Sequence, residues 1–249
     1  MVIVSGPTGS GKSTSLYASL KEIKSDSTNI TTVEDPVEYQ LDGINQIQVK
    51  ENIGLTFSAS LRSILRQDPD ILLIGEIRDE ETADIAVKFS LTGHLVFSTV
   101  HANDAPSTIT RLLDIGIKPF LVGSCLNLVM AQRLVRRICE NCKEEYDPST
   151  EELRLIGIDR SRLNGKHLFK GKGCNRCRNT GYHGRTAIFE IIPMTRKIRG
   201  LIFDNENEDV IRQTALEEGM VTLRESGIEK MIEGITSLHE VQRSTIEDL

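Results

Sequence analysis

A glycine-rich loop near the start of the chain constrains the fold more than any other feature of the sequence. The loop follows the apolar stretch 1–4 and precedes a run of helical periodicity over 15–24. It reads GPTGSGKST, which matches GxxxxGK[ST] in the strand–loop–helix order that a phosphate-binding loop (P-loop) requires. Glycine lets the backbone turn its N–H groups toward phosphate oxygens, and the helix N-terminus adds partial positive charge. The predicted site for a nucleoside triphosphate consists of Gly6, Pro7, Thr8, Gly9, Ser10, Gly11, Lys12, Ser13 and Thr14.

Lys12 and Ser13 carry the specific chemistry of this loop. The Lys12 ammonium can reach the β- and γ-phosphates, and the Ser13 hydroxyl can hold Mg²⁺. A glycine-rich turn that only caps a helix is the alternative, and the strand and helix on either side of the loop argue against it. Because the motif lies at the very start of the chain, we expect the sequence to be part of a longer protein.

Composition limits the class of protein. A chain of 249 residues has room for one large domain, or for one domain with a small satellite. Short apolar segments alternate with segments of helical periodicity, which predicts the α/β class. The net charge of −6 gives no overall attraction to nucleic acid or anionic lipid, and no apolar run reaches the roughly 18 residues of a membrane span. Two CxxC pairs beside a nucleotide site indicate a reducing cytosol.

Acidic residues follow two of the predicted strands. The β-branched stretch 29–33 leads to Glu34 and Glu38, and the apolar stretch 71–74 leads to Glu76. Ligands of parallel sheets bind at the carboxyl ends of the strands. Glu76 occupies the place where a P-loop ATPase keeps a carboxylate that faces Mg²⁺. Either Glu34 or Glu38 could approach the γ-phosphate as a general base, or both could only decorate a turn.

Two histidines flank a third apolar strand, predicted at 95–100. His94 precedes this strand and His101 follows it. Side chains alternate between the two faces of a strand, so the two imidazoles are expected on opposite faces. His101, at the carboxyl end, is the better candidate for a group that senses phosphate, and His94 is the better candidate for a structural role.

Four more segments follow the P-loop in a fixed order: VEDPVEYQ, DPDILLIGEIRD, TGHLVFSTVHAND and AQRLVRRIC. With the P-loop they resemble the secretion-superfamily ATPases of type II secretion and type IV pilus assembly, the GspE/PilB family, over residues 6–193. In that family they are the aspartate box, the Walker B segment, the histidine box and the entry to a cysteine lobe. The resemblance implies a RecA-like P-loop core at 1–133, a zinc-binding cysteine lobe at 134–192 and a C-terminal helical subdomain at 193–249.

The resemblance also implies an activity, ATP hydrolysis that powers the assembly of pilin or pseudopilin subunits. Glu38 would polarise the attacking water, Glu76 would hold Mg²⁺ through water, and His101, with His94, would sense the γ-phosphate. Charge contacts within or across subunits would come from Arg62, Arg66 and Arg78. A hexamer is implied at the cytoplasmic face of the inner membrane, with an inner-membrane platform protein and cytoplasmic adaptor proteins as partners. The family's large N-terminal region, which helps to clamp the nucleotide, is absent from this sequence.

Two CxxC pairs form the second chemical motif of the chain. Cys139 and Cys142 stand before the insert 144–173, and Cys174 and Cys177 stand directly after it. Each pair can supply two thiolates to one tetrahedral Zn²⁺, and four thiolates close a structural site with no open position for catalysis. A redox role lacks a thioredoxin-like βαβ context, and four unliganded thiols are the remaining alternative. We predict one structural zinc ion.

Two other interpretations stay open. Basic residues around the cysteine pairs fit a nucleic-acid-dependent P-loop motor, against which stand the acidic net charge, the lack of Trp and an aromatic content of 4%. We therefore expect no nucleic-acid partner. A zinc-bearing assembly module with a degenerate nucleotide site conflicts with the presence of Lys12, Ser13 and Glu76. The sequence does not distinguish type II secretion from type IV pilus assembly.

Overall fold

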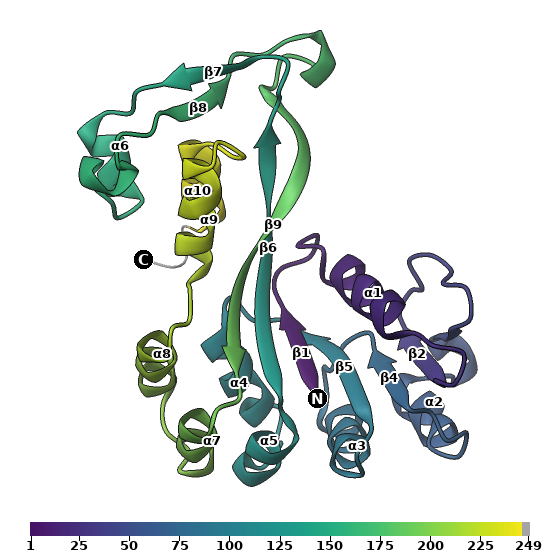
Figure 1. Ribbon diagram of the computed structural model, residues 1–249. Coiled ribbons are helices and arrows are strands. Elements are labelled where there is room, and N and C mark those ends of the chain that lie inside the picture. The colour runs from purple at the N-terminus through teal and green to yellow at the C-terminus, as the bar shows by residue number, and fades with distance from the viewer. Residues whose placement is uncertain (246–249) are drawn as a thin grey trace. The chain divides into compact units, whose positions relative to one another are not determined.

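The computed structural model describes residues 1–245, and the chain forms two compact units. Unit 1 consists of Met1–Ala131 and Ile191–Met220, and unit 2 consists of Gln132–Glu190 and the segment from Val221 onward. Figure 1 traces the chain through both units. Each unit has a hydrophobic core of its own.

A largely parallel sheet starts in unit 1, and its strands β6 and β9 continue into unit 2 (Figure 1). Its strands are β1 (Val2–Ser5), β2 (Ile30–Glu34), β3 (Asn45–Gln48), β4 (Ile71–Ile74), β5 (Leu95–Val100), β6 (Leu128–Ile138) and β9 (Tyr182–Pro193), in the order β3-β2-β4-β5-β1-β6-β9. β1 pairs in parallel with β5 on one side and with β6 on the other, so the strand that leads into the P-loop is central. β3 is the edge strand and pairs in parallel with β2. The predicted α/β class is confirmed.

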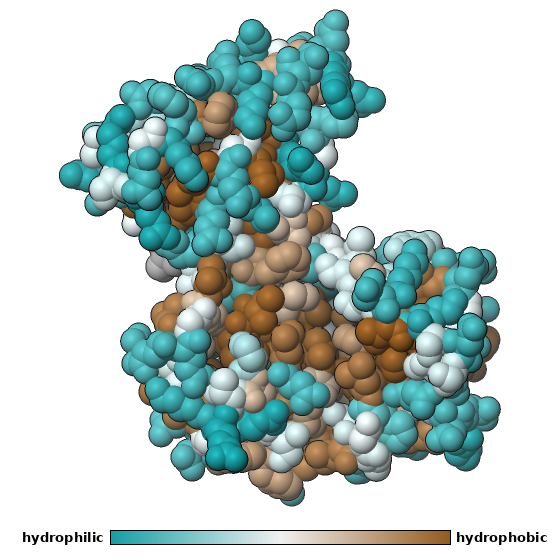
Figure 2. Space-filling view, in the orientation of Figure 1, coloured by the Kyte–Doolittle hydropathy of each residue, from teal (hydrophilic) through white to brown (hydrophobic). Residues whose placement is uncertain are grey.

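The amino-acid composition of the strands explains how deeply each strand is buried. All four residues of β4 and all five residues of β2 are buried, as expected for apolar and β-branched strands covered on both faces. The edge strand β3 is mostly polar and partly exposed. In the view of Figure 2, hydrophobic residues gather over the strands of unit 1, whereas hydrophilic residues dominate the surface around β7, β8 and α6.

Helices connect and cover the strands of unit 1. They are α1 (Lys12–Ile23), η1 (Glu51–Ile53), α2 (Phe57–Ile64), α3 (Glu80–Leu91), α4 (Ala105–Asp114), α5 (Pro119–Cys125), α7 (Arg196–Phe203) and α8 (Glu208–Glu217). The apolar stripe of α1, formed by Leu16, Tyr17 and Leu20, packs in one core cluster with Val4 and Leu73 of the sheet. The helix after the P-loop is therefore tied directly to the sheet.

The register of the strands brings the predicted site residues to one edge of the sheet. Ser5 of β1 lies beside Val100 of β5, so the P-loop and His101 leave neighbouring strands at the same level. Val33 of β2 lies beside Ile74 of β4, so the acidic segments after these two strands also start together. The predicted site residues therefore gather at the carboxyl edge of the sheet, where ligands of parallel sheets bind.

Unit 2 combines a small antiparallel ribbon with helices. Its elements are β7 (Lys143–Tyr146), α6 (Thr150–Leu155), η2 (Arg160–Leu163), β8 (Leu168–Gly171), η3 (Asn175–Cys177), α9 (Leu223–Ile232) and α10 (Leu238–Ser244). β7 pairs with β8, so the ends of the insert between the CxxC pairs are held together. Leu153 and Leu163 of the insert pack with Met231 and Leu238 in the core of this unit.

The predicted division into segments 1–133, 134–192 and 193–249 remains a proposal about domains. The compact units group the C-terminal segment differently, because Ile191–Met220 joins unit 1 and the chain from Val221 onward joins unit 2. Within residues 1–245, no helix combines the length and the apolar character needed to cross a membrane.

Candidate functional site

The P-loop joins β1 to α1 with three glycines in unusual backbone conformations. Gly6, Gly9 and Gly11 have φ values of 141°, 80° and 88°. Residues other than glycine rarely adopt such positive φ values. Gly11 is the N-cap residue of α1, and no side chain among residues 1–245 caps the helix there. The first N–H groups of α1 therefore face the loop, where an anion can accept their hydrogen bonds.

Lys12 folds back over the loop. Its Nζ donates hydrogen bonds to the carbonyl oxygens of Gly6 (2.8 Å) and Pro7 (3.2 Å). Burial lowers the pKa of Lys12, and the nearby negative charge of Glu76 opposes this shift. The ammonium is therefore held within electrostatic reach of Glu76, at the position from which it can exchange carbonyl oxygens for phosphate oxygens.

The other residues of the P-loop provide a mixture of exposed and covered groups. Pro7, Thr8 and Gly9 are exposed at the tip, whereas Ser10 is buried. Ser13 is half-buried on the first turn of α1, directly after Lys12. The nine predicted nucleotide-binding residues thus form the loop after β1 and the first turn of α1.

Glu76 is the centre of a small group of charged side chains after β4. Its side chain is 12% exposed, and its Oε2 lies 2.5 Å from Nε of Arg78 and 3.6 Å from Nε2 of His101. The ion pair raises the pKa of Arg78, because the hydrogen bond and the charge of Glu76 stabilise the guanidinium. The carboxylate of Glu76 and the hydroxyl of Ser13 are the oxygen ligands that Mg²⁺ prefers, so these residues fit a magnesium site.

Gly75 precedes Glu76, at a position where related P-loop proteins often carry an aspartate. Its N–H donates a 2.7 Å hydrogen bond to the carbonyl of Val33. A Cβ at this position would lie 3.3 Å from Cα of Glu34 and 3.3 Å from the carbonyl oxygen of Val33. Glycine avoids these tight contacts and so favours the close approach of β2 and the end of β4.

The structure separates the two acidic residues that sequence reasoning left open. Glu34 is 4% exposed, and its carboxylate accepts hydrogen bonds from Tyr17, from Thr32 (2.6 Å) and from Gln46 (3.2 Å). Glu38 is exposed, and its backbone N–H donates to the Tyr17 hydroxyl at 3.3 Å. Glu34 is therefore a buried anchor, and Glu38 is the carboxylate that solvent and a ligand can reach.

Tyr17 is a residue of this site that the sequence analysis missed. Its spacing on α1 marks it only as part of the buried apolar stripe, and it is 0% exposed. Burial and the hydrogen bond to Glu34 raise the pKa of Tyr17, so the hydroxyl stays protonated. In the sequence, the only sign of this role is a hydroxyl group among apolar positions, because the hydrogen-bond partners of the Tyr17 hydroxyl lie in a different segment of the chain.

The two histidines lie at opposite ends of β5. His101 follows the carboxyl end and lies near Glu76. His94 precedes the amino end, where its ring stacks on Phe89 with centroids 4.2 Å apart and its Nδ1 lies 2.9 Å from the Thr92 hydroxyl. Within one chain, only His101 belongs to the group around Glu76, and the contacts of His94 are local.

The three arginines singled out from the sequence also differ in position. Arg78 pairs with Glu76, as described. Arg62 on α2 forms an exposed ion pair with Glu81 on α3. Arg66 is exposed just after α2. Contacts of Arg62 and Arg66 with a second subunit stay a prediction.

In unit 2, the four cysteines of the CxxC pairs converge. Their sulfur atoms lie within 4.8 Å of one another, and three of the separations are 3.9 Å (139–174), 3.8 Å (142–177) and 3.7 Å (174–177). A tetrahedron with Zn–S bonds of about 2.3 Å has S···S edges of about 3.8 Å. The cluster therefore fits Zn²⁺ in both donor type and spacing. The cysteines are Cys139, Cys142, Cys174 and Cys177.

The surroundings of Cys174 and Cys177 favour thiolates, whereas burial raises the pKa of Cys142 to about 12. The N–H groups of Cys174 and Gly181 donate to the Cys177 sulfur at 3.2 Å and 3.3 Å. A hydrogen bond from the Asn141 side chain is the largest of the effects that lower the pKa of Cys174 to about 6. A Cβ on Gly171 would lie 2.0 Å from the carbonyl oxygen of Gly181, so the two backbones meet with no room for side chains. By contrast, burial within α5 raises the pKa of Cys125 to about 11.

The chain is similar to a known family and to several known proteins. Residues 1–243 match the family described as "Type II/IV secretion system protein". The chain is 50% identical over 245 residues to the type IV pilus assembly ATPase PilB of Thermus thermophilus. It is 49% identical to PilB of Myxococcus xanthus and 48% identical to the type II secretion system protein E of Pseudomonas aeruginosa. These alignments cover 98% to 100% of this chain but 28%, 44% and 49% of the relatives, so the chain spans less than half of each.

Solved structures give the same picture of the fold. The pilus retraction motor PilT with bound ADP matches 100% of this chain and 62% of its own, with a TM-score of 0.72 and 27% identity. The ATPase DotB of Legionella pneumophila matches with a TM-score of 0.71 at 22% identity, which supports the fold alone. The family match over nearly the whole chain carries the assignment. This chain belongs to the type II/IV secretion system protein family.

Proposed function

We propose that this chain is the part of a secretion or pilus assembly ATPase that binds MgATP and hydrolyses it. The observation that carries the proposal is the convergence of Lys12 and Glu76 at one edge of the sheet, with His101 beside Glu76 and Glu38 on a neighbouring loop. The relatives named PilB and type II secretion protein E support the same activity.

The residues of the P-loop bind the nucleotide. Backbone N–H groups of the loop and of the first turn of α1 donate to phosphate oxygens, and Lys12 leaves the carbonyls of Gly6 and Pro7 for the β- and γ-phosphates. Ser13 and Glu76 would hold Mg²⁺, with Glu76 acting through water. The ion would supply positive charge that offsets the charge of the triphosphate.

Glu38 acts in the chemical step. Its exposed carboxylate accepts a proton from the attacking water, which requires an approach to within about 3 Å of that water. His101 lies between the P-loop edge and Glu76, so the imidazole can respond when the γ-phosphate leaves. Because Arg78 and His101 share Glu76, loss of the γ-phosphate changes the electrostatic balance of all three groups.

The machine that the ATPase serves is proposed from the relatives. A motor that converts loss of phosphate into movement needs a neighbouring subunit, and a closed ring satisfies head-to-tail contacts. We infer a homohexamer, located in the cytoplasm at the periphery of the inner membrane. Its partners are a membrane platform protein and cytoplasmic adaptor proteins, and its work is the assembly of pilins or pseudopilins. A zinc ion held by the four cysteines would stabilise unit 2.

An ATPase assay on the intact protein tests the proposal. We expect MgATP hydrolysis whose turnover per chain rises with protein concentration, since a ring must assemble. Lys12→Ala removes the main cationic partner of the phosphates, so nucleotide binding or turnover should be lost. Lys88→Ala is the control, because Lys88 is exposed on α3 and pairs only with Asp84 among the described residues. Full hydrolysis by Lys12→Ala would refute the site.

The same assay distinguishes the nucleic-acid motor. The family match and the relatives favour secretion and pilus assembly over that interpretation. Single-stranded DNA is therefore expected to leave the turnover of wild-type protein unchanged. A strong, saturable stimulation by the DNA would instead support the nucleic-acid motor.

A further inference from the structure

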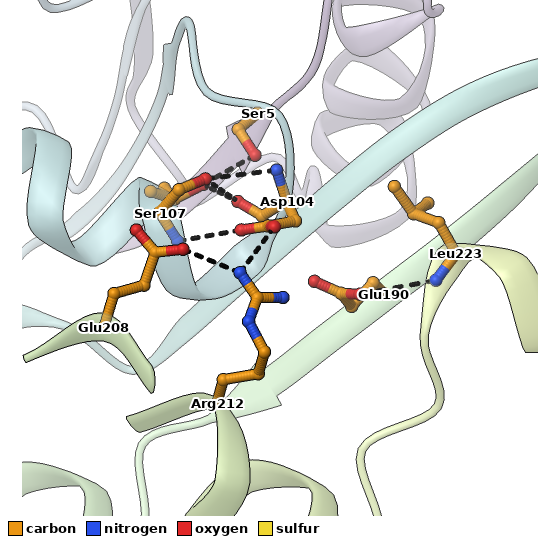
Figure 3. A network of polar contacts seen from close by, with 8 residues as sticks. Ser5, Asp104, Ser107, Glu190, Glu208, Arg212 and Leu223 are labelled. Carbon is orange, nitrogen blue, oxygen red and sulfur yellow. Dashed lines mark hydrogen bonds and ion pairs between the residues drawn. The ribbon is translucent and has the colours of Figure 1, made fainter. Parts of the chain in front are cut away.

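An arginine of α8 joins two carboxylates in unit 1, one of them on the segment that follows His101. The Arg212 guanidinium donates to Oδ2 of Asp104 at 2.7 Å and to Oε1 of Glu208 at 2.6 Å. Figure 3 shows its side chain extending from α8 between the two carboxylates. The side chains of Arg212, Asp104 and Glu208 are 32%, 16% and 34% exposed, so the group is partly shielded from water.

Asp104 also caps a helix, because it is the N-cap residue of α4. Its Oδ1 accepts a 2.8 Å hydrogen bond from the N–H of Ser107, and the Ser107 hydroxyl interacts with the Asp104 backbone in turn. Burial opposes ionisation of Asp104, but the hydrogen bonds from Ser107 and the ion pair with Arg212 outweigh it and lower the pKa. One carboxylate thus holds the start of α4 with one oxygen and Arg212 with the other.

The first turn of α4 is also connected to the strand that enters the P-loop. The hydroxyls of Thr108 and Ser5 are joined by a 2.7 Å hydrogen bond, and both residues are 0% exposed. The Thr108 hydroxyl oxygen also lies 2.6 Å from the carbonyl oxygen of Asp104. Ser5 directly precedes Gly6, whose carbonyl accepts from Lys12. The contacts shown in Figure 3 therefore continue from α8 to the base of the P-loop.

The other end of the segment carries His101. Only two residues stand between His101 and Asp104, and His101 lies 3.6 Å from Glu76. A displacement of Asp104 must therefore be absorbed by this short connection or passed on to the imidazole. The segment from His101 to Thr108 has Glu76 near its first residue and Ser5 bonded to its last, and Arg212 contacts it between them, at Asp104.

We propose that Arg212 is a positioning residue for the nucleotide site, which acts through Asp104 to hold His101 beside Glu76 and α4 beside the P-loop. The proposal rests on the proposed ATPase function. Loss of the Arg212–Asp104 pair leaves the glycine loop and Lys12 in place, so ATP still binds. The segment after β5 relaxes, and His101 no longer lies in the geometry that turnover requires.

An ordinary surface ion pair would behave differently. Exposed pairs contribute little, and their loss changes stability by a small amount without a specific effect on turnover. Arg212 instead contacts a carboxylate that is mostly covered and that caps a helix next to the site. Mutations in such connecting networks change coupling between sites by amounts that correspond to roughly 2- to 30-fold in rate.

Steady-state ATP hydrolysis and nucleotide affinity in variants of the intact protein test this role. Arg212→Met removes the guanidinium and keeps the apolar stem, and Asp104→Asn removes the charge while leaving an oxygen for the helix cap. We expect each variant to lower kcat by about 3- to 30-fold, with the KM for ATP within about twofold of wild type. Arg212→Lys, which keeps one charge, should recover part of the lost kcat.

Two further comparisons connect the effect to the contact. The double variant Asp104→Asn/Arg212→Met should be no slower than the slower single variant, because both remove the same interaction. Glu217→Gln is the matched control, because Glu217 lies on α8 like Arg212 but forms an exposed 2.9 Å ion pair with Lys197 of α7. This variant should leave kcat unchanged. Amide hydrogen exchange over residues 101–108 should increase in Arg212→Met, with or without nucleotide.

Different results would overturn the role of Arg212 and the ATPase function. An unchanged kcat in Arg212→Met with only a lower melting temperature would reduce the pair to a stabilising contact and overturn the proposal. Additive effects in the double variant, or unchanged exchange over 101–108, would also overturn it. Absence of hydrolysis by wild-type protein, with normal exchange differences between the variants, would instead reject the ATPase function.

Discussion

The backbone N–H of Glu38 donates a 3.3 Å hydrogen bond to the Tyr17 hydroxyl, and this hydroxyl in turn donates to the buried carboxylate of Glu34. Tyr17 lies on α1, which starts at Lys12. The residue proposed to activate water and the residue proposed to bind phosphate are therefore connected through one buried side chain. Tyr39 packs edge-on against Tyr17, with ring centroids 4.8 Å apart, and closes the loop over it.

Tyr17→Phe should slow turnover and leave ATP binding nearly intact. The ring still fills the core, but Glu34 loses a donor and the Glu38 N–H loses its acceptor. An unsatisfied buried polar group costs about 1–3 kcal/mol, so the melting temperature should also fall. We expect kcat to fall by about tenfold, measured by steady-state hydrolysis beside a fluorescent nucleotide titration.

Tyr39→Phe is the control for this prediction, because the Tyr39 side chain is 46% exposed and the variant keeps its ring against Tyr17. It should resemble wild type in both assays. If Tyr17→Phe were as active as Tyr39→Phe, the connection to Glu38 would have no catalytic meaning.

Glu38 and Glu76 should fail in different ways when each is changed to glutamine. Glu38→Gln keeps the shape and removes the basicity, so ATP should still bind while hydrolysis falls by ~100-fold or more. Glu76→Gln removes the charge that pairs with Arg78 and faces Mg²⁺, so it should weaken the magnesium dependence of nucleotide binding. Titration of nucleotide at several Mg²⁺ concentrations distinguishes the two. Equal loss of nucleotide binding in both variants would contradict the division of roles.

Elemental analysis should find about one zinc ion per chain in protein purified without chelator. Replacement of one ligand, for example Cys177→Ser, should destabilise unit 2 by roughly 4 kcal/mol or more, because metal binding contributes to folding directly. ATP affinity should change much less. Cys125→Ala is the matched control, since this buried cysteine lies in α5 of unit 1 and should leave the zinc content at one. Metal-free wild-type protein would return the four thiols to an unliganded role.

Asp104 should contribute to the acid stability of the protein. Its pKa is lowered in the folded state, so the unfolded chain binds the proton more tightly. The stabilisation is therefore present above the unfolded pKa of about 3.9 and is lost as the pH falls through the lower folded value. Asp104→Asn has no carboxylate at this position and therefore lacks this pH-dependent stabilisation. The difference in unfolding free energy between wild type and Asp104→Asn should be largest above about pH 5 and shrink below about pH 4. A difference that is constant with pH would exclude this linkage.

Much of the nucleotide edge was predictable because its signals are local. The P-loop carries glycine spacing, Lys12 and Ser13 within nine adjacent residues, and the strand before it and the helix after it are visible in the same window. Glu76 could be predicted as a site residue because it follows a short apolar strand, and parallel strands end at a common edge. The α/β class followed from apolar segments alternating with helical periods, and it is confirmed by the parallel pairing of β1 with β5.

Other features depend on segments that are distant in the sequence. Asp104 and Arg212 are 108 residues apart, and Glu34 meets Tyr17 and Gln46 from two other elements. The two glycines at 171 and 181 look like ordinary turn residues in the sequence, yet their backbones leave no room for a Cβ. The grouping of Ile191–Met220 with unit 1 likewise depends on packing rather than on any local boundary signal.

The sequence by itself determined which chemical groups this protein has, since the P-loop, Glu76, His101 and the CxxC pairs are read from contiguous residues and their spacing. Only the tertiary structure decided which groups meet. It buried Glu34 and left Glu38 exposed, it brought His101 close to Glu76, and it joined Arg212 to the segment after His101. Periodicity reports whether a side chain faces the core, but the partner of a buried polar group is chosen by the packing of elements that are far apart in the chain.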